Sequence, residues 1–188
     1  MFEHSQIELY VTAGSDQQNA SIEALLASAP VDAVVAQTLQ AVHVMQPVML
    51  TLLITDDEGI REMNKQYREQ DKPTDVLSFP LLDAPIVQAP AEQLWMQPDE
   101  QENALTKPQV PAFVTPPNAI TNLGDVVMSW PTLTQQAADA GHTPVYELLY
   151  LLSHGVLHLV GYDDQSEAGY QAMVSIQQLV LQAVGQKA

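Results

Sequence analysis

Two histidines, four residues apart on one apolar helix, constrain the fold of this chain more than any other feature. Residues 145–160 are nearly all apolar and include His154 and His158. Side chains at that helical spacing share one face, with their Cβ atoms about 5–6 Å apart. Gly161 follows, and glycine readily adopts the left-handed backbone that ends many helices. The pattern predicts a buried helix that presents both imidazoles to one metal ion and stops at Gly161.

The chain after Gly161 offers a third ligand. Asp163 and Asp164 follow the expected helix end, and a carboxylate oxygen binds zinc at about 2.0–2.2 Å. Three protein ligands leave a fourth position for water, as in catalytic zinc sites. We expect one Zn²⁺ per chain, held by His154, His158 and Asp164, with Asp163 as the alternative. The competing interpretation is a pair of core histidines bonded to backbone, which the nearby glycine and carboxylate disfavour.

Composition limits the partners and the compartment. The 188 residues carry a formal net charge of -17, which argues against generic attraction to nucleic acid or an anionic membrane. There is no cysteine, so neither a disulfide nor a thiolate metal site can form. The first residues lack the basic and apolar regions of a signal peptide, and Pro47, Glu147 or the histidines interrupt the long apolar runs. We expect a soluble, cytoplasmic protein.

The few basic residues are clustered. Four of the six lie in one segment, on or just after a helix expected to end near Gln70: Arg61, Lys65, Arg68 and Lys72. Their spacing predicts one stripe of that helix, opposite an inward face formed by Ile60, Met63 and Tyr67. A solvated helix face is the simpler interpretation. Because basic residues are so scarce elsewhere, the cluster also suggests a phosphate-binding surface.

Apolar periodicity predicts strands that alternate with helices. The expected strands are 7–11, 48–54, a short one ending at Pro80, and 123–129. The expected helices are 21–44 (capped by Ser21, with a second start at Val31), 56–70, 130–140, 144–160 and 166–184. The interleaving indicates a layered α/β or α+β domain, and the length fits one domain, residues 1–188.

A Pro-rich, acidic insertion separates the last two expected strands, at about residues 82–122. It holds seven prolines, which prevent a central strand or a long helix. We expect disorder, with a short ordered patch at residues 94–96. Deleting about residues 85–116 is therefore expected to leave stability nearly unchanged.

Four segments, in this order, resemble the YbeY family, the metal-dependent endoribonucleases of ribosomal RNA maturation: residues 61–68, 71–80, 123–129 and 154–163. The resemblance extends from about residue 48 to 165. It implies an α+β fold, with a small mixed, mostly parallel sheet packed with helices and a metzincin-like metal helix. Two features depart from the family pattern. Asp164 stands where the family has a third histidine, and the insertion is longer than the usual connection.

The resemblance also implies roles and partners. His154 and His158 match the family's metal ligands, and Arg61 matches its functionally important arginine, for which phosphate binding is the natural catalytic role. RNA contact would extend over Lys65, Arg68 and Lys72. The implied substrate is single-stranded ribosomal RNA, with small-subunit ribosomal proteins or an assembly GTPase as partners, and neither membrane nor DNA. Asp75 and Asp125 are candidates for a general base.

Two other functions compete with RNA hydrolysis. The spacing His-x3-His-x2-Gly-x2-Asp also occurs in metzincin proteases, but these carry a glutamate base directly after the first histidine. Gly155 occupies that place here and cannot take a proton. The other alternative is a zinc-stabilised ribosome-assembly factor without catalytic activity, which the acidic composition and Asp164 keep open.

Overall fold

The computed structural model describes residues 5–95 and 119–186, and these contain one four-stranded sheet. Its strands are β1 (Ser5–Thr12), β2 (Val48–Thr55), β3 (Val76–Pro80) and β4 (Thr121–Ser129), in the order β1-β2-β4-β3. The pairs β1–β2 and β2–β4 are parallel, whereas β3 runs antiparallel to β4 at the edge. The expected mixed, mostly parallel sheet is confirmed.

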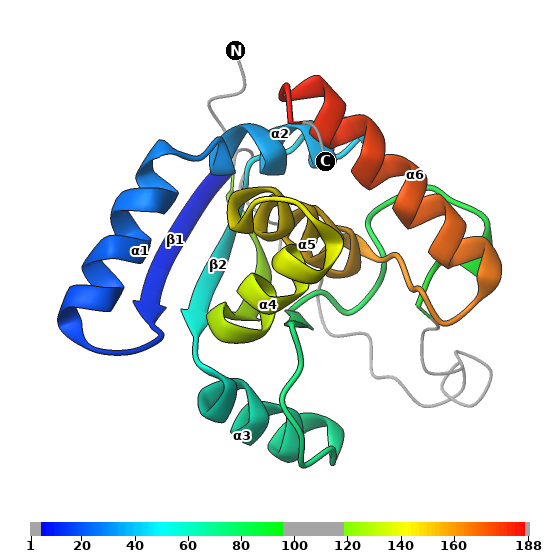
Figure 1. Cartoon of the computed structure of the whole chain (residues 1–188). Coiled ribbons are helices and arrows are strands. Elements are labelled where there is room, and N and C mark those ends of the chain that lie inside the picture. Colours follow the sequence, from blue (N-terminus) through cyan, green and yellow to red (C-terminus); the bar gives the residue numbers. More distant parts are fainter. Residues whose placement is uncertain (1–4, 96–118, 187–188) are drawn as a thin grey trace.

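Six helices of the described residues accompany this sheet: α1 (Asp16–Ser28), α2 (Val31–Ala41), α3 (Asp57–Arg68), α4 (Trp130–Ala140), α5 (Pro144–Val160) and α6 (Glu167–Ala183). Helix α5 lies at the centre of the helical layer, with α2, α4 and α6 around it (Figure 1). None of the described helices alone is long and apolar enough to cross a membrane; α1 and α2 meet that criterion only together, as a pair bent by 53°.

Local capping sets the bounds of α5 as predicted. The Thr143 hydroxyl accepts a hydrogen bond from the Tyr146 amide at 3.1 Å, and Pro144 occupies the first turn, where its missing N–H costs nothing. At the other end Gly161 has φ 132°, a conformation that only glycine adopts readily. The histidine helix therefore begins and ends where the sequence places it.

The start of α1 differs from its prediction. Ser15, not Ser21, caps the helix, in a capping box with Gln18. The Ser21 hydroxyl instead donates to the Gln17 carbonyl inside the helix. The reciprocal hydrogen bonds of the capping box favour the earlier start. The predicted second start at Val31 is confirmed.

The two faces of β4 connect the sheet to different helices, because successive residues of a strand point to opposite sides. Val126 lies against Gly155 of α5, whereas Val127 packs with Ile60 of α3. Ile60 is buried as predicted, but Tyr67 is 63% exposed, so its predicted inward position is wrong. Asn64 is buried instead, and its side-chain amide donates to the Lys72 carbonyl at 2.8 Å.

The predicted disorder of the insertion is wrong for residues 82–93, whereas the ordered patch predicted at residues 94–96 is confirmed for Leu94 and Trp95. We call residues 82–95 the strap. The strap packs on the C-terminal end of α5, with Val87 in the core. The Ile86 amide donates to the Val160 carbonyl at 3.0 Å, and a 3-10 turn, η1 (Ala91–Gln93), follows. Proline excludes regular structure, but backbone groups beside it can still bond to a neighbouring segment. Residues 96–118 lie outside the described residues, and β4 already begins at Thr121.

Candidate metal centre

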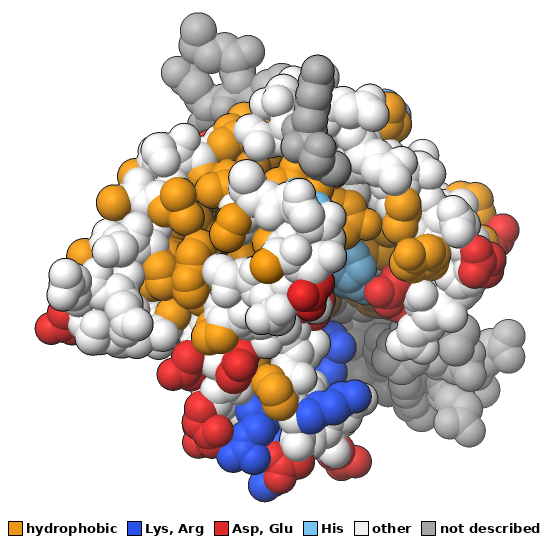
Figure 2. Space-filling view, in the orientation of Figure 1, with side chains coloured by type: hydrophobic (Ala, Val, Ile, Leu, Met, Phe, Trp, Pro, Cys, Tyr) orange, Lys and Arg blue, Asp and Glu red, His pale blue; other side chains and the backbone are white. Residues whose placement is uncertain are grey.

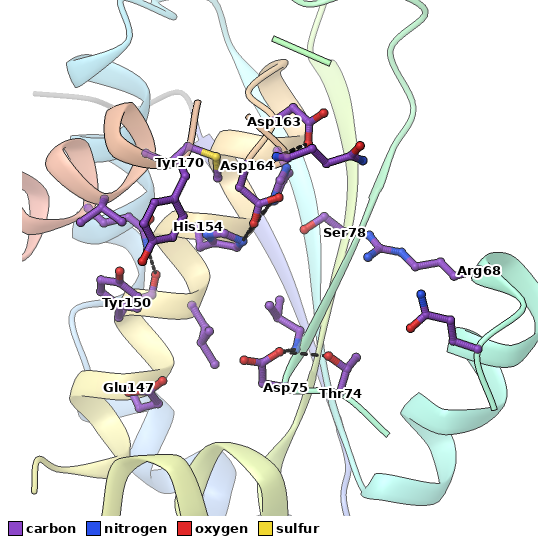
Figure 3. Close-up of a pocket in the computed structure, with 18 residues that line it drawn as sticks. Arg68, Thr74, Asp75, Ser78, Glu147, Tyr150, His154, Asp163, Asp164 and Tyr170 are labelled. Atoms are coloured by element: carbon purple, nitrogen blue, oxygen red, sulfur yellow. Dashed lines mark hydrogen bonds and ion pairs between the residues drawn. The ribbon is translucent and has the colours of Figure 1, made fainter. Parts of the chain in front are cut away.

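A cavity of about 830 Å³ lies between α5, β3 and α6 (Figure 3). One stripe of α5 lines it: Glu147, Tyr150, Leu151, His154 and His158. The spacings of three and four residues place these side chains on a single helical face. The turn after α5 adds Asp163 and Asp164, and the facing wall is formed by residues from α3 and β3, including Arg68, Asp75 and Ser78.

The three predicted ligands converge at one end of this cavity. His154 Nε2 and His158 Nε2 are 3.0 Å apart. Asp164 Oδ2 lies 3.6 Å from the first nitrogen and 3.8 Å from the second. One ligand atom from each residue falls within 4.8 Å of the others. The structure thus brings together the two imidazoles that the four-residue spacing predicted to lie side by side, and it adds the Asp164 carboxylate.

The tautomer of His158 follows from its backbone contact. His158 Nδ1 lies 2.9 Å from the Tyr162 carbonyl oxygen. A carbonyl oxygen can only accept, so Nδ1 must carry the hydrogen. The neutral ring then has its lone pair on Nε2, which faces the other two ligand atoms.

Gln177 of α6 lines the same cavity as His154 of α5. Its side chain is fully buried, and its Nε2 donates to the Tyr150 carbonyl at 3.2 Å. That contact determines the amide orientation, because the atom facing a carbonyl oxygen must be nitrogen. Gln177 Oε1 has no hydrogen-bond partner in the described residues, although it borders the same cavity as His154. Buried polar atoms in proteins are nearly always hydrogen-bonded, so this buried acceptor is expected to accept a hydrogen bond from a nearby donor.

The electrostatics of the site favour neutral imidazoles beside an ionised carboxylate. Burial lowers the pKa of His154, the neighbouring His158 acts in the same direction, and Asp164 and Gln177 oppose the shift. The polar contact with His158, whose Nε2 lies 3.8 Å from the carboxylate, lowers the pKa of Asp164 to about 2; His154 acts in the same direction and burial opposes the shift. Neutral histidine and ionised aspartate are the protonation states that bind a metal.

This arrangement fits a divalent metal of the zinc type. Two nitrogens bound tetrahedrally at 2.0–2.1 Å would lie roughly 3.3 Å apart, close to the observed 3.0 Å. Two lone pairs facing each other at that distance repel unless a cation or proton lies between them. Nitrogen, nitrogen and carboxylate oxygen are a donor set that zinc accepts. The two histidines and Asp164 would hold such an ion.

The geometry distinguishes the two candidate aspartates. The Asp163 carboxylate accepts a hydrogen bond from the Gln165 amide at 3.3 Å. Its backbone amide donates to the Gln93 carbonyl of the strap. Asp163 borders the cavity, but among the described residues the group of converging ligand atoms includes Asp164 and not Asp163.

The basic residues differ in their surroundings. Arg61 is paired with Glu58 at 2.6 Å and with Asp71 at 2.9 Å, and Lys65 also reaches Asp71, at 2.8 Å. Figure 2 shows Lys and Arg side chains over α3, interleaved with acids. Among the described cavity-lining residues, Arg68 is the basic side chain; it extends from the end of α3 toward Ser78 (Figure 3). Arg61, Lys65 and Lys72 lie outside this lining.

The two carboxylates considered as general bases lie on different cavities. Asp75 borders the cavity of the histidines, where its carboxylate accepts hydrogen bonds from the Val76 amide at 2.8 Å and from Gln136 at 3.2 Å. Asp125 lines a second cavity together with Leu53 and Val127. The alternation of side chains along β4 places Asp125 on the face away from α5.

The family model described as endoribonuclease YbeY matches residues 13–185. The chain belongs to the YbeY family. An endoribonuclease YbeY of Dehalococcoides mccartyi (strain ATCC BAA-2100) is 38% identical over 151 residues, which cover 80% of this chain and 83% of the relative. One from Roseiflexus sp. (strain RS-1) is 38% identical over 159 residues, 84% of each chain. The resemblance drawn from the four segments is confirmed.

A solved structure also resembles this YbeY-family chain. The solution structure of a Thermotoga maritima protein aligns with a TM-score of 0.49 and 19% identity, over 95% of this chain and 91% of that one.

Sequence patterns missed several residues of the YbeY-family site. Glu147 and Tyr150 lie seven and four residues before His154, so the helical periodicity that paired the histidines could also have found them. Gln177 lies on another helix, 23 residues after His154. No pattern within the sequence indicates that contact.

Proposed function

We propose that this chain is a zinc-dependent endoribonuclease that hydrolyses single-stranded RNA in ribosomal RNA maturation and ribosome quality control. The observation that carries the proposal is the pair of imidazoles whose Nε2 atoms face each other at 3.0 Å beside Asp164. This pair lies in a cavity large enough for part of an RNA strand. Unpaired RNA suits such a cavity because its bases can be unstacked and its backbone can bend.

His154, His158 and Asp164 are assigned to hold one zinc ion. Zinc in such a site polarises a phosphodiester and lowers the pKa of a water molecule. The hydrogen bond between His158 and the Tyr162 carbonyl keeps one ring oriented. Gln177 is assigned the same role for His154, with Oε1 as acceptor for the Nδ1 hydrogen. Such outer contacts orient metal ligands and support affinity.

Arg68 is assigned the contact with the RNA phosphate, because its guanidinium borders the cavity and can bind phosphoryl oxygens bidentately. Arg61, the residue that matches the family's important arginine, is assigned to the edge of this binding region. There it pairs with Asp71 and orders the turn before β3. Lys65 and Lys72 would contribute weaker, longer-range attraction for RNA.

A protein of net charge -17 repels the phosphate backbone at long range. Efficient cleavage therefore requires a partner that presents the RNA. Small-subunit ribosomal proteins or an assembly GTPase, in the cytoplasm, are the partners that we assign to this role.

Purified, zinc-loaded protein should cut single-stranded RNA endonucleolytically and leave a duplex of the same sequence intact. His154→Ala and His158→Ala should each lose the metal, as measured by elemental analysis, and lose cleavage with it. His43→Ala is the matched control, because His43 is exposed and lies on α2's C-terminal side, away from the cavity. Full metal occupancy in both site variants would contradict the assigned ligands.

The same experiment separates the alternatives. If the protein binds zinc but cuts no RNA with any divalent metal, the non-catalytic assembly factor becomes the better assignment. Arg68→Ala and Arg61→Ala, each checked for retained metal, distinguish a direct phosphate contact from an ordering role. Arg68→Ala should lower cleavage at all RNA concentrations more than Arg61→Ala does.

A further inference from the structure

The cavity continues past the histidines toward the N-terminal end of α5. Glu147 lies seven residues before His154, about 10 Å along the helix, and both border the same cavity. Between them lie Tyr150 and the apolar Leu151. The metal-binding atoms therefore occupy one end of a longer depression (Figure 3).

Two tyrosines border this extension. Tyr150 projects from α5 and Tyr170 from the first turns of α6, and both flank the side of the cavity opposite Arg68 (Figure 3). Tyr170 is 49% exposed, and Tyr150 is half-buried against the core but still borders the cavity. Exposed aromatic faces at an RNA site are the usual stacking surface for an unpaired base.

A partly desolvated carboxylate borders the extension as well. The Glu147 side chain is only 13% exposed, and its Oε2 lies 3.3 Å from His142 Nε2. Within the described residues, this ion pair uses Oε2 and leaves Glu147 Oε1 without a hydrogen-bond donor. Burial raises the pKa of Glu147 and the charge of Asp75 adds to the shift, against the effect of His142. A carboxylate in this position favours a ligand that donates hydrogen bonds.

The wall of the cavity that faces Glu147 also carries a hydrogen-bond acceptor. Asp75 of the turn before β3 lies across the cavity from Glu147 (Figure 3), and a carboxylate only accepts hydrogen bonds. Adenine, cytosine and guanine each carry an exocyclic amino group that donates. Uracil has no exocyclic amino group: its one base donor, N3–H, lies between two carbonyl oxygens, and these would face the carboxylates with like polarity.

We propose that this extension is a base-recognition subsite for a nucleotide next to the cut, with Tyr150 and Tyr170 as stacking surface and Glu147 as acceptor for an amino group. The subsite would favour adenine, cytosine or guanine over uracil. This inference rests on the proposed ribonuclease function and adds its substrate preference.

Base preference in cleavage gives the first test. Zinc-loaded protein should cut oligoadenylate and oligocytidylate with a kcat/KM roughly tenfold or more above that for oligouridylate of equal length, as expected for a lost hydrogen bond to a charged group. Glu147→Gln should shrink this difference to within about threefold, because an amide both donates and accepts. Glu167→Gln, an exposed substitution on α6, should leave the preference unchanged. Tyr170→Ala should raise KM for every substrate, and Tyr170→Phe should not.

Binding of nucleotides gives a second test that does not depend on cleavage. Adenosine and cytidine monophosphate should perturb the NMR signals of Tyr150 and Tyr170 at lower concentration than uridine monophosphate does. In Glu147→Gln the three nucleotides should act at similar concentrations. Equal binding of all three nucleotides, or an unchanged preference in Glu147→Gln, would overturn the subsite. Nucleotide discrimination without any RNA cleavage would refute the ribonuclease and leave the subsite standing.

Discussion

Gly155 limits which chemistry the histidine helix can support. A Cβ atom at this position would lie 2.7 and 2.9 Å from the two methyl groups of Val126, a fully buried residue of β4. Separations below 3.0 Å force a neighbour to move. The glutamate that metzincin proteases place here would therefore disturb the contact between α5 and the sheet. The lack of room is a structural reason against the protease interpretation.

Gly155→Ala should destabilise the protein, although alanine is favoured over glycine within a helix by about 1 kcal/mol. Overpacking against a buried neighbour costs about 1–3 kcal/mol, so the net loss in unfolding free energy should be about 0–2 kcal/mol. Chemical denaturation measures it. Val126→Ala in the same chain should relieve the clash, so the two changes should be non-additive. If Gly155→Ala were more stable than the parent, the packing between α5 and Val126 would have room for the added methyl group.

Gln177→Leu should weaken zinc binding by about 10–100-fold, the usual effect of removing an outer contact to a ligating histidine. Leucine fills the space but cannot accept the His154 Nδ1 hydrogen. Gln177→Glu, which can accept, should restore most of the affinity. Competition with a chromophoric chelator measures affinity, and ¹⁵N NMR of the His154 ring reports its tautomer. Gln178→Leu, at an exposed position, is the control. Loss of affinity without any tautomer change would indicate a general packing effect.

At the scale of elements, the strap holds the turn that carries Asp164. Trp95 donates from its backbone amide to the Gly161 carbonyl at 2.9 Å and from Nε1 to the His158 carbonyl at 3.1 Å. Leu94 forms a bridge with Tyr162, and the Ser166 hydroxyl donates to the Glu92 carbonyl. Leu94 and Trp95, from the predicted ordered patch, and Glu92, from the part predicted to be disordered, thus support the site.

Val87→Ala in the strap should lower the unfolding free energy by about 1–3 kcal/mol, because it removes buried methyl groups from the core. Leu179→Ala, at a position 64% exposed, should stay within about 0.5 kcal/mol of the parent. Thermal and denaturant unfolding of both variants provide the comparison. If Val87→Ala were as stable as the parent, the strap would not contribute to the core.

At the scale of the whole molecule, the charge distribution predicts weak dependence of RNA affinity on salt. Each neutralised phosphate of a single strand contributes a slope of about -0.7 in log K against log salt. All four clustered basic residues together would give roughly -3. Because acids already pair with Arg61 and Lys65, we expect a slope of roughly -1 to -2. Fluorescence anisotropy of metal-free protein with single-stranded RNA measures it. A slope of roughly -3 would show that these ion pairs open on binding.

Features that depend on neighbouring residues could be predicted from the amino-acid sequence. The histidine helix, its proline start and its glycine end follow from contacts within a few positions along the chain. The pairing of His154 with His158 follows from helical periodicity, and the order of four segments identifies the YbeY family. The alternation of strands and helices indicated a layered α/β or α+β domain, and the family resemblance implied the mixed, mostly parallel sheet.

Features that depend on residues distant in the chain became visible with the tertiary structure. It brings the Asp164 carboxylate, not that of Asp163, next to the two imidazoles, because the direction of the chain after a helix end is set by what it packs against. It also places Arg68, not Arg61, at the cavity, because the packing of α3 against the sheet sets which of its residues face α5. It revealed the buried Gln177 from α6 and the strap on the end of α5. Hydrogen bonds across such separations leave no periodic mark in a sequence, because local geometry does not constrain which distant groups meet.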